Sequence, residues 1–432
     1  MSRPSRHRIP EWFVWVAFLG SFAGTLAAAP AHAANCAGDS TGMIPITDLG
    51  AGLYHGFPGG LYAGGSNLRP AGHEAAGIAI ANAIGPLDTL GQHDANGRVV
   101  LISIGMSNAT QEFSEFVTRA NADPFKDARV QVIDCAVGGQ SADRINTPAA
   151  AYWDSVRARL RVRGSSAAQV QAVWIKEANA GPTGGFPAST VTLQNNLGAI
   201  VRIIHDKFPN VKLAYLTSRI YAGYATTALN PEPYAYESGF AVKWLIDSQI
   251  AGEDSLNWDP DTGPVEAPWL SWGPYLWADG LEPRGDGLTW ACSEFAADGT
   301  HPGPPARMKV ADSLLAFFRS DATTAPWYMD PGSVSVGEPR DGGIALRVAP
   351  NPAQGEVTIT FVAPAGKPWR AELLDLAGRR VADLGHGIGA GVTHTLRRSS
   401  LPADGARRAG LYWVRVTSGG QPASQRVVII AK

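Results

Sequence analysis

The sequence predicts a doubly wound α/β domain followed by a small all-β domain. From about residue 98, apolar runs typical of buried parallel strands alternate with longer amphipathic segments. After residue 320 the composition changes to a stretch rich in Pro, Gly and Ser, and short alternating segments follow it. The length of 432 residues suits two or three domains of ordinary size.

Four strands and four helices are expected in the α/β domain. The strands are expected at residues 98–104, 129–135, 170–176 and 211–217. Apolar side chains recur at spacings of three and four in the helical segments, which cover residues 113–120, 152–160, 193–204 and 304–319. This alternation predicts a parallel sheet whose ligand site lies at the carboxyl ends of its strands.

The C-terminal segments predict an antiparallel β-sandwich, with strands at residues 344–348, 356–362, 370–376, 392–396, 411–417 and 425–430. The expected organisation is a signal peptide, an N-terminal segment that packs on the α/β domain, the α/β domain itself, a linker and the sandwich. These five parts cover residues 1–33, 34–97, 98–320, 321–343 and 344–432.

The N-terminus has the order of a bacterial secretory signal. Three arginines precede an apolar run at residues 12–29, and the small-residue stretch Ala31-His32-Ala33 follows. The alternative is an uncleaved membrane anchor, because the run is nearly long enough to span a bilayer. We expect cleavage, a protein that is secreted or on the cell surface, and no membrane insertion after the signal is removed.

Charge and cysteine content exclude several classes of protein. Lys and Arg number 36 against 38 Asp and Glu, without long runs of either sign, so a nucleic-acid partner is not expected. The three cysteines, Cys36, Cys135 and Cys292, allow at most one disulfide, and the sequence leaves the pairing open. No Cys-x-x-Cys is present, so neither a zinc ribbon nor a thiol-redox site is supported.

A candidate nucleophile directly follows the first strand of the α/β domain. In Gly105-Met106-Ser107-Asn108 the serine stands at a strand-to-helix turn, where its hydroxyl is held at the sheet edge. Its backbone N–H lies at the positive end of the following helix. A lone Gly-x-Ser is a weak signal, since serine is also a common residue at helix starts.

Candidate oxyanion donors follow the next two strands. Gly139 lies in a glycine-containing turn where a backbone N–H can approach a ligand closely, and Asn179 follows the third strand. Together with the Ser107 N–H they would supply three donors to the intermediate of acyl transfer.

The last polar cluster is Asp298-Gly-Thr-His301, directly before the closing helix. An Asp three residues before a His can accept a hydrogen bond from one imidazole nitrogen and leave the other to face a serine hydroxyl. Each signal is modest alone. All four fall at the ends of successive α/β units, on the edge where such sheets bind ligands.

These blocks resemble those of the SGNH (GDSL-like) hydrolases over residues 98–319. The resemblance implies a three-layer α/β/α, flavodoxin-like sheet and a serine esterase without metal or cofactor. It implies Ser107 as nucleophile, His301 as base, Asp298 as its orienter, and the Ser107 N–H, Gly139 N–H and Asn179 side chain as the oxyanion hole. Two residues depart from the family pattern. Met106 replaces the usual Asp, and a Glu177 carboxylate near the oxyanion would oppose its negative charge. The alternatives are that Glu177 points away from the oxyanion or contacts substrate.

The aromatic segment at residues 219–300 carries six tryptophans, including Trp272 and Trp277. Two interpretations stay open, an insertion with its own aromatic core or a wall of the substrate site, since aromatic faces stack well on sugar rings. Under the second, Trp272, Trp277 and Glu177 would bind substrate.

The C-terminal segments resemble type IX secretion sorting domains, or the related FlgD-like Ig fold, at residues 348–352, 374–381 and 410–414 (VAPNP, LDLAGRRV and GLYWV). This resemblance implies secretion machinery as a partner. We expect the whole protein to hydrolyse a carboxylic ester, with an acetyl group on a small molecule or polysaccharide as substrate. The alternatives are a non-catalytic carbohydrate-binding or adhesion protein and an O-acyltransferase with the same triad.

Overall fold

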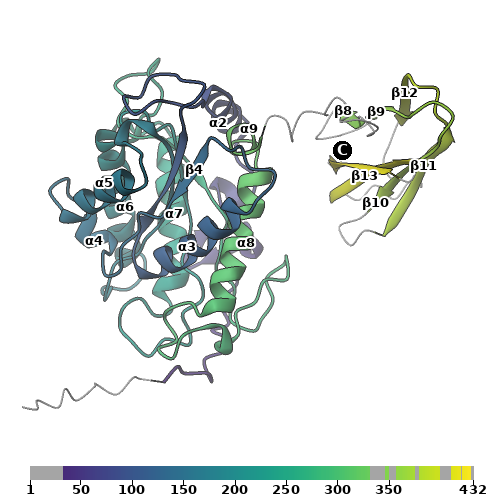
Figure 1. The fold of residues 1–432 in the computed structure, drawn as a ribbon. Helices are drawn as coiled ribbons and strands as arrows, with labels where there is room; N and C mark the ends of the chain where they lie inside the picture. Colours follow the sequence, from purple (N-terminus) through teal and green to yellow (C-terminus); the bar gives the residue numbers. More distant parts are fainter. Residues whose placement is uncertain are drawn as a thin grey trace, which may run out of the picture.

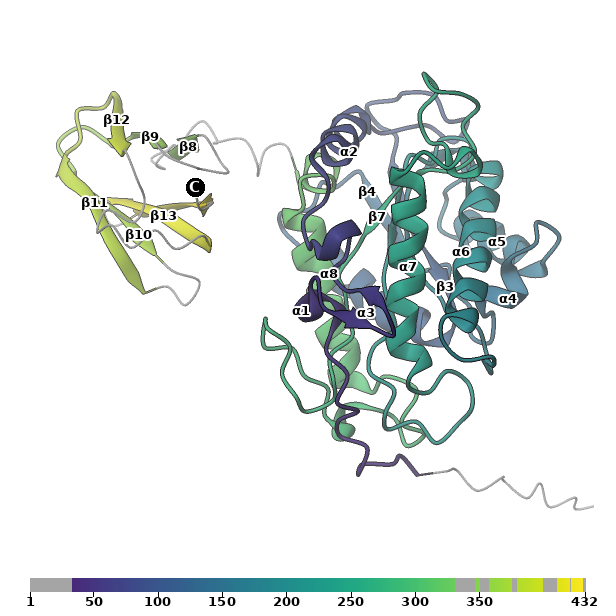
Figure 2. The same ribbon diagram turned by 180° about the vertical axis from the view of Figure 1, so that it is seen from behind.

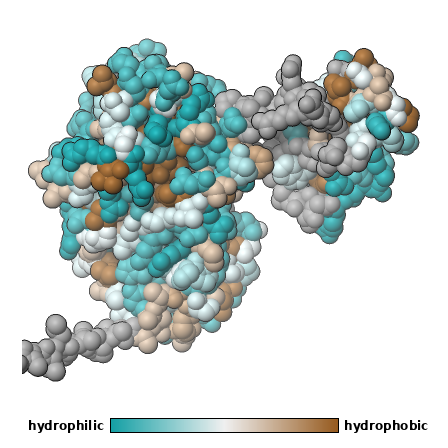
Figure 3. Space-filling view, in the orientation of Figure 1, coloured by the Kyte–Doolittle hydropathy of each residue, from teal (hydrophilic) through white to brown (hydrophobic). Residues whose placement is uncertain are grey.

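The computed structural model describes residues 33–330, 346–349, 357–374, 379–398, 410–419 and 421–429 (Figure 1). The expected signal peptide lies outside the described residues except for Ala33, as does most of the expected linker. Within the described part of the chain, no helix is long and apolar enough to cross a membrane. On the face of the α/β domain in Figure 3, hydrophilic side chains predominate and hydrophobic ones form small scattered groups.

A five-stranded sheet organises the α/β domain. Its strands lie in the order β4-β3-β5-β6-β7, and every neighbouring pair is parallel. This is the order of a flavodoxin-like doubly wound sheet, so the predicted fold class is confirmed. The strands are β3 (Val99–Gly105), β4 (Val130–Ile133), β5 (Val170–Lys176), β6 (Leu213–Leu216) and β7 (Trp269–Trp272).

Helices cover both faces of the sheet (Figures 1 and 2). One face carries α3 (Ser107–Asn121) and α8 (Pro304–Ser320), with α2 (Ala71–Ala83) and α9 (Ala325–Tyr328) beside them. The other face carries α5 (Ala151–Val162), α6 (Ala188–Lys207) and α7 (Tyr234–Ile250). The shorter elements are α1 (Ile46–Leu49), β1 (Leu53–Tyr54), β2 (Phe57–Pro58), α4 (Ala142–Ile145), and the 3-10 turns Ala63–Gly65, Ala167–Gln169, Asp254–Leu256 and Cys292–Glu294.

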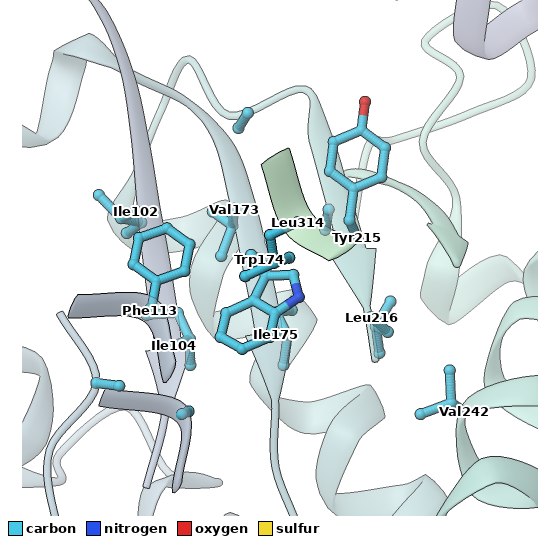
Figure 4. Packing of buried hydrophobic residues seen from close by; sticks show 14 of the residues in the cluster. Ile102, Ile104, Phe113, Val173, Trp174, Ile175, Tyr215, Leu216, Val242 and Leu314 are labelled. Carbon is cyan, nitrogen blue, oxygen red and sulfur yellow. The ribbon is translucent and has the colours of Figure 1, made fainter. Parts of the chain in front are cut away.

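The core lies between the sheet and these helices. β3 and β5 are buried along their whole length, as expected of strands in the middle of a parallel sheet that helices cover on both faces. Phe113 of α3 stacks on Trp174 of β5 with ring centroids 5.2 Å apart (Figure 4). The Trp174 indole N–H donates to Thr217 Oγ1 at 2.9 Å, so the ring is buried without an unpaired donor.

The aromatic segment at residues 219–300 belongs to this same core. It supplies α7 and the fifth strand, β7, and Trp269, Trp277 and Trp290 join the cluster that includes β3 and β5. Neither an insertion with a separate core nor a substrate wall describes these tryptophans. The sequence pattern misses β7 because this strand has only four residues, Trp-Leu-Ser-Trp, between Pro-containing segments.

The N-terminal segment is tied to the α/β domain by a disulfide and by a buried carboxylate. Cys36 pairs with Cys292, with their Cα atoms 5.4 Å apart, and Cys135 is a buried free thiol. Asp279 accepts hydrogen bonds from Ser40 Oγ and from the Thr41 and Gly42 N–H groups. A structural disulfide forms outside the reducing cytoplasm, which indicates an extracytoplasmic location.

The C-terminal residues form two antiparallel sheets, as the sequence predicts. Their orders are β11-β10-β13-β14 and β12-β9-β8, and one apolar cluster joins them. The strands are β8 (Leu346–Ala349), β9 (Val357–Val362), β10 (Pro368–Leu374), β11 (Arg380–Ile388), β12 (Thr393–Arg398), β13 (Gly410–Ser418) and β14 (Gln421–Ile429). The sequence pattern misses β11 because two register shifts and two glycines interrupt its alternation.

The described part of the expected linker, residues 321–330, packs on the α/β domain. It contains α9, whose Trp327 and Tyr328 are buried in the main core. Residues 331–343 of the linker lie outside the described residues.

Replacing both bridged cysteines, Cys36→Ser with Cys292→Ser, is expected to lower the free energy of unfolding by about 2–5 kcal/mol. The bridge joins residues 256 positions apart, so its loss frees a long stretch of the unfolded chain. Urea unfolding followed by tryptophan fluorescence measures the change. A reducing agent should lower the stability of the wild type and not that of the double variant; equal responses of the two proteins would contradict the prediction.

Candidate active site

Ser107 is the first residue of α3 and lines a cavity of about 280 Å³ at the carboxyl edge of the sheet. Glycine is required at Gly105, because an added Cβ would lie 2.6 Å from the Lys176 carbonyl oxygen and 2.4 Å from Ala109 Cβ. This close approach brings the start of α3 onto the edge of β3 and β5. The Ser107 N–H belongs to the first helical turn, whose amides have no partner within the helix.

The structure brings Ser107, His301 and Asp298 into one hydrogen-bonded chain. The Ser107 hydroxyl donates to His301 Nε2 at 2.8 Å, and His301 Nδ1 donates to Asp298 Oδ2 at 2.5 Å. Asp298 Oδ1 accepts from the backbone N–H groups of Thr300 and His301, both at 3.0 Å. With Asp298 holding one ring nitrogen, the imidazole presents the other to the serine hydroxyl, which is the arrangement of an activated nucleophile.

Asp298 remains ionised in this arrangement. Partial burial would raise the pKa of its carboxyl group, but hydrogen bonds from the His301 backbone and side chain and from the Thr300 N–H outweigh burial and lower it. The carboxylate can therefore stabilise the positive charge that His301 acquires when it takes the serine proton.

The loop that carries Asp298 and His301 is fixed by contacts with two other parts of the domain. Asn108 Nδ2, buried on the first turn of α3, donates to the Thr300 carbonyl oxygen at 3.0 Å. Gly299 has φ +62°, and an added Cβ would lie 1.9 Å from the Tyr224 carbonyl oxygen. The sequence Asp-Gly-Thr-His thus combines a glycine that the turn requires with a direct link to the helix of the serine.

Gly139 also lies in the cavity of Ser107. It has φ +76°, and nothing lies within 4 Å of an added Cβ, so its backbone faces open space. A Cβ on neighbouring Gly138 would lie 3.8 Å from Ser107 Cβ, which shows how near this turn is to the serine. Arg144 Nη1 donates to the Gly139 carbonyl oxygen at 3.0 Å, and no partner is found for the Gly139 N–H in the described chain. The N–H is thus available to a ligand.

Asn179 lies beside the cavity and is not among its lining residues. A chain of amides orients its side chain: Asn146 Nδ2 donates to Asn196 Oδ1, and Asn196 Nδ2 donates to Asn179 Oδ1 at 2.8 Å. Because the Asn179 oxygen is the acceptor in this chain, its Nδ2 remains as the free donor. The side chain has the polarity that an oxyanion contact needs, although it is set back from Ser107.

The structure does not bring the three expected substrate-binding side chains into the cavity. Trp272 and Trp277 are 2% and 0% exposed, and their indole N–H groups donate to the Leu61 carbonyl oxygen and to Glu232 Oε1. Both rings are core residues with satisfied donors, so the expectation that they contact substrate is wrong. Residue type alone misleads here because aromatic rings serve cores and ligand sites equally well.

Glu177 is also buried, at 2% exposure, and does not line the cavity. Its Oε2 accepts from the Ala178 N–H, whereas Oε1 has no partner. Burial raises the pKa of Glu177 well above the usual value, which favours the neutral acid. Buried outside the cavity lining, Glu177 does not reach substrate, so the expectation that it binds substrate is wrong, and its raised pKa weakens the negative charge that it would set against an oxyanion.

Several cavity residues were not singled out in the sequence. They include Arg219 and Asn230 after β6, and Arg144 on α4. Arg219 follows the fourth strand by a few residues, so the reasoning that found Ser107, Gly139 and Asn179 after the other strands applies equally to it. Among the described residues, no group of three or more His, Cys, Asp or Glu side chains could hold a metal ion.

No protein-family model matches this chain, and no curated protein matches it either. Among solved structures, it is similar to the periplasmic domain of a lipopolysaccharide acetyltransferase from Salmonella ser. Paratyphi A. The identity is 14%, with 52% of this chain and 83% of that chain covered and a TM-score of 0.28. It is also similar to dimeric latent PorU from Porphyromonas gingivalis, at 17% identity and a TM-score of 0.18, over 21% of this chain and only 9% of that one. Both scores lie far below 0.5, so the function is argued from this chain's own residues.

Asn108→Ala is expected to slow the reaction of Ser107 with a fluorophosphonate about 10- to 100-fold, because the loop of His301 loses its link to α3. It should also lower the free energy of unfolding by about 1–3 kcal/mol, since the Thr300 carbonyl oxygen loses its partner. Labelling rates and urea unfolding measure the two effects. Asn121→Ala, at the exposed end of the same helix, is the control; an unchanged labelling rate in Asn108→Ala would contradict a positioning role.

Glu177→Gln is expected to stabilise the protein increasingly as pH rises above about 4.5, the ordinary pKa of a glutamate. The folded wild type holds its proton more tightly than the unfolded chain does, so its stability is full below that pH and is lost as pH rises toward the folded pKa. The gap between variant and wild type should grow by up to about 1.4 kcal/mol per pH unit. Urea unfolding at pH 5, 6, 7 and 8 measures it, and a gap that does not depend on pH would refute the raised pKa.

Proposed function

We propose that this protein is a secreted serine esterase of the SGNH type that hydrolyses a carboxylic ester, with an acetyl ester of a carbohydrate as its substrate class. The observation that carries the proposal is the chain Ser107–His301–Asp298, with distances of 2.8 and 2.5 Å, in a cavity that also contains the backbone of Gly139. A hydroxyl, an imidazole and a carboxylate in this order provide nucleophilic catalysis of acyl transfer.

In the first step, Ser107 Oγ attacks the ester carbonyl carbon and its proton passes to His301 Nε2. Asp298 stabilises the resulting imidazolium through Nδ1. The intermediate collapses when His301 returns the proton to the leaving alcohol, which leaves an acyl group on Ser107. A water molecule then repeats the sequence with His301 as base, and the carboxylic acid is released.

The oxyanion of the intermediate is stabilised by N–H groups near the start of α3. The Ser107 and Gly139 N–H groups belong to residues that line the cavity, and the positive end of the α3 dipole adds to them. Asn179 Nδ2, which Asn196 orients beside the cavity, is proposed as the third donor. Each donor is worth roughly 3 kcal/mol of the barrier.

Small acyl groups fit the proposal best, because the cavity of about 280 Å³ has to hold the acyl group together with part of the alcohol. The secretory signal at residues 1–33 and the Cys36–Cys292 disulfide support a secreted or cell-surface enzyme. The C-terminal sandwich is proposed to engage secretion machinery, since it carries the sorting-type motifs; residues 350–352 and 375–378 of those motifs lie outside the described residues.

The test is fluorophosphonate labelling of the purified mature protein, followed by p-nitrophenyl acetate turnover. Wild type is expected to label and to turn over, Ser107→Ala to do neither, and His301→Ala to lose at least about 10³-fold in kcat. Asp298→Asn should lose a comparable factor, because it stabilises the wrong imidazole tautomer.

The same assay separates the other candidate functions. Wild type that neither labels nor turns over would refute the hydrolase and favour a binding or adhesion protein. Wild type that labels, hydrolyses slowly and transfers acetyl to an added sugar acceptor would favour an O-acyltransferase. Ser155→Ala, an exposed serine on α5 that does not line the cavity, is the matched control and should behave as wild type.

A further inference from the structure

Arg219 is a buried cation without a partner at the cavity of Ser107. The residue is 1% exposed and lines that cavity. Its Nε and Nη1 atoms are buried without any hydrogen-bond acceptor, and its side chain makes no ion pair among the described residues. Only its backbone is bonded, with the N–H donating to Ser238 Oγ at 3.1 Å and the carbonyl oxygen accepting from Ser218 Oγ.

Three carboxylates, those of Glu112, Glu232 and Glu177, lie near enough to favour the charge of Arg219, but none of them forms a hydrogen bond or an ion pair with it in the described chain. Lys176 Nζ donates to both carboxylate oxygens of Glu112, at 2.6 and 2.5 Å, so these two charges satisfy each other. Glu177 is buried in a setting that favours its neutral acid. Glu232 accepts from the Trp277 indole N–H and from the Ala222 and Tyr236 N–H groups, so its oxygens are already hydrogen-bonded to other donors.

The charged side chains that line the cavity are positive, like Arg219. Two arginines, Arg144 and Arg219, line it, and none of its described lining residues is Asp or Glu. The chain as a whole carries a net charge of -2, so this excess of positive charge is local. A cavity that concentrates one sign of charge attracts ligands of the opposite sign.

An unpaired buried charge is costly, and proteins retain one mainly where a ligand completes it. An arginine remains protonated even when buried, so Arg219 cannot avoid this cost by losing its proton. Its planar set of N–H donors matches the two oxygens of a carboxylate. The oxyanion of the intermediate is a single oxygen that already has the N–H groups of Ser107 and Gly139 beside it.

We propose that Arg219 binds a carboxylate of the substrate, which makes the preferred ester an acidic one. The inference rests on the proposed esterase function and names its substrate class. The carboxylate can stand on the alcohol, as in an acetylated uronic acid, or on the acyl group, as in a hemiester of a dicarboxylic acid. In both cases Arg219 determines specificity and Ser107 and His301 perform the chemistry.

Two matched pairs of esters test the proposal and distinguish the two sources of the carboxylate. The alcohol-side pair is methyl 3-O-acetyl-glucuronide and methyl 3-O-acetyl-glucoside; the acyl-side pair is mono-p-nitrophenyl succinate and p-nitrophenyl butyrate. Wild type is expected to prefer the acidic member of one pair by about 30-fold in kcat/KM, equivalent to one charged hydrogen-bonded contact. In Arg219→Met that ratio should fall to about 1, mainly through KM, and Arg219→Lys should restore part of it.

Arg161→Met is the control, because Arg161 is an exposed arginine on α5 that does not line the cavity; its ratio and its rates should equal those of wild type. Wild type without a preference in either pair would overturn the proposal whatever the variants do. So would a preference that survives in folded Arg219→Met. An equal loss on acidic and neutral esters in that variant would instead assign Arg219 to the oxyanion or to the fold, and would also overturn it.

A binding measurement separates this inference from the esterase proposal. Calorimetric titration of Ser107→Ala protein with methyl glucuronide, methyl glucoside, succinate and butyramide requires no turnover. Tighter binding of the acids by at least tenfold, abolished by adding Arg219→Met, would support the carboxylate site even if the wild type hydrolyses nothing. Turnover of neutral esters without any preference for acids in binding would leave the esterase standing and refute the site.

Discussion

The pairing of Gly105 with Lys176, at the ends of the central strands β3 and β5, determines where the rest of the site lies. Gly105 has no side chain that would separate β3 and β5 from α3. The helix therefore begins directly at the sheet edge, with Ser107 as its first residue. The Gly105 carbonyl oxygen accepts from the Val137 N–H at 2.9 Å, which brings the Gly139 turn beside the serine. The backbone of Gly105 thus aligns β3 with β5, and it brings the turn before α3 next to the turn that carries Gly139.

A second constraint is the number of charged groups buried at this edge. Lys176 and Glu112 form a contact pair with less than 2% of either side chain exposed, and Asp134 accepts from Ser103, Thr110 and Ser114 and so ties β3 and α3 to the end of β4. These groups are satisfied within the protein, and they hold the serine helix in place. Arg219 is buried among them without a partner, which is why it is the residue that a ligand would complete.

Most of the α/β fold and the triad were predictable from local sequence. The strands and helices showed their own periodicity, and Ser107, Asp298 and His301 lay at a strand end or directly before a helix. Each position also suits a capping residue, so it was their conjunction at one edge of the sheet that indicated a site. β7 was missed because a four-residue aromatic strand has no visible period, and β11 because glycines and two register shifts interrupt it. Trp272, Trp277 and Glu177 were misassigned because their residue types fit a substrate wall and a core equally well, and only burial separates the two.

The sequence by itself determined the class of sheet and predicted the three residues, Ser107, His301 and Asp298, that the structure joins in one hydrogen-bonded chain, since each of these signals depends on neighbours within a few positions. Tertiary structure decided which cysteines pair, that the aromatic segment completes the main core, that Asn179 is oriented by Asn196, and that Arg219 faces the cavity unpaired. These features depend on residues tens to hundreds of positions apart. What each of these residues can do depends on how deeply it is buried and on which hydrogen-bonding partners lie near it. Neither property can be read from the sequence around the residue.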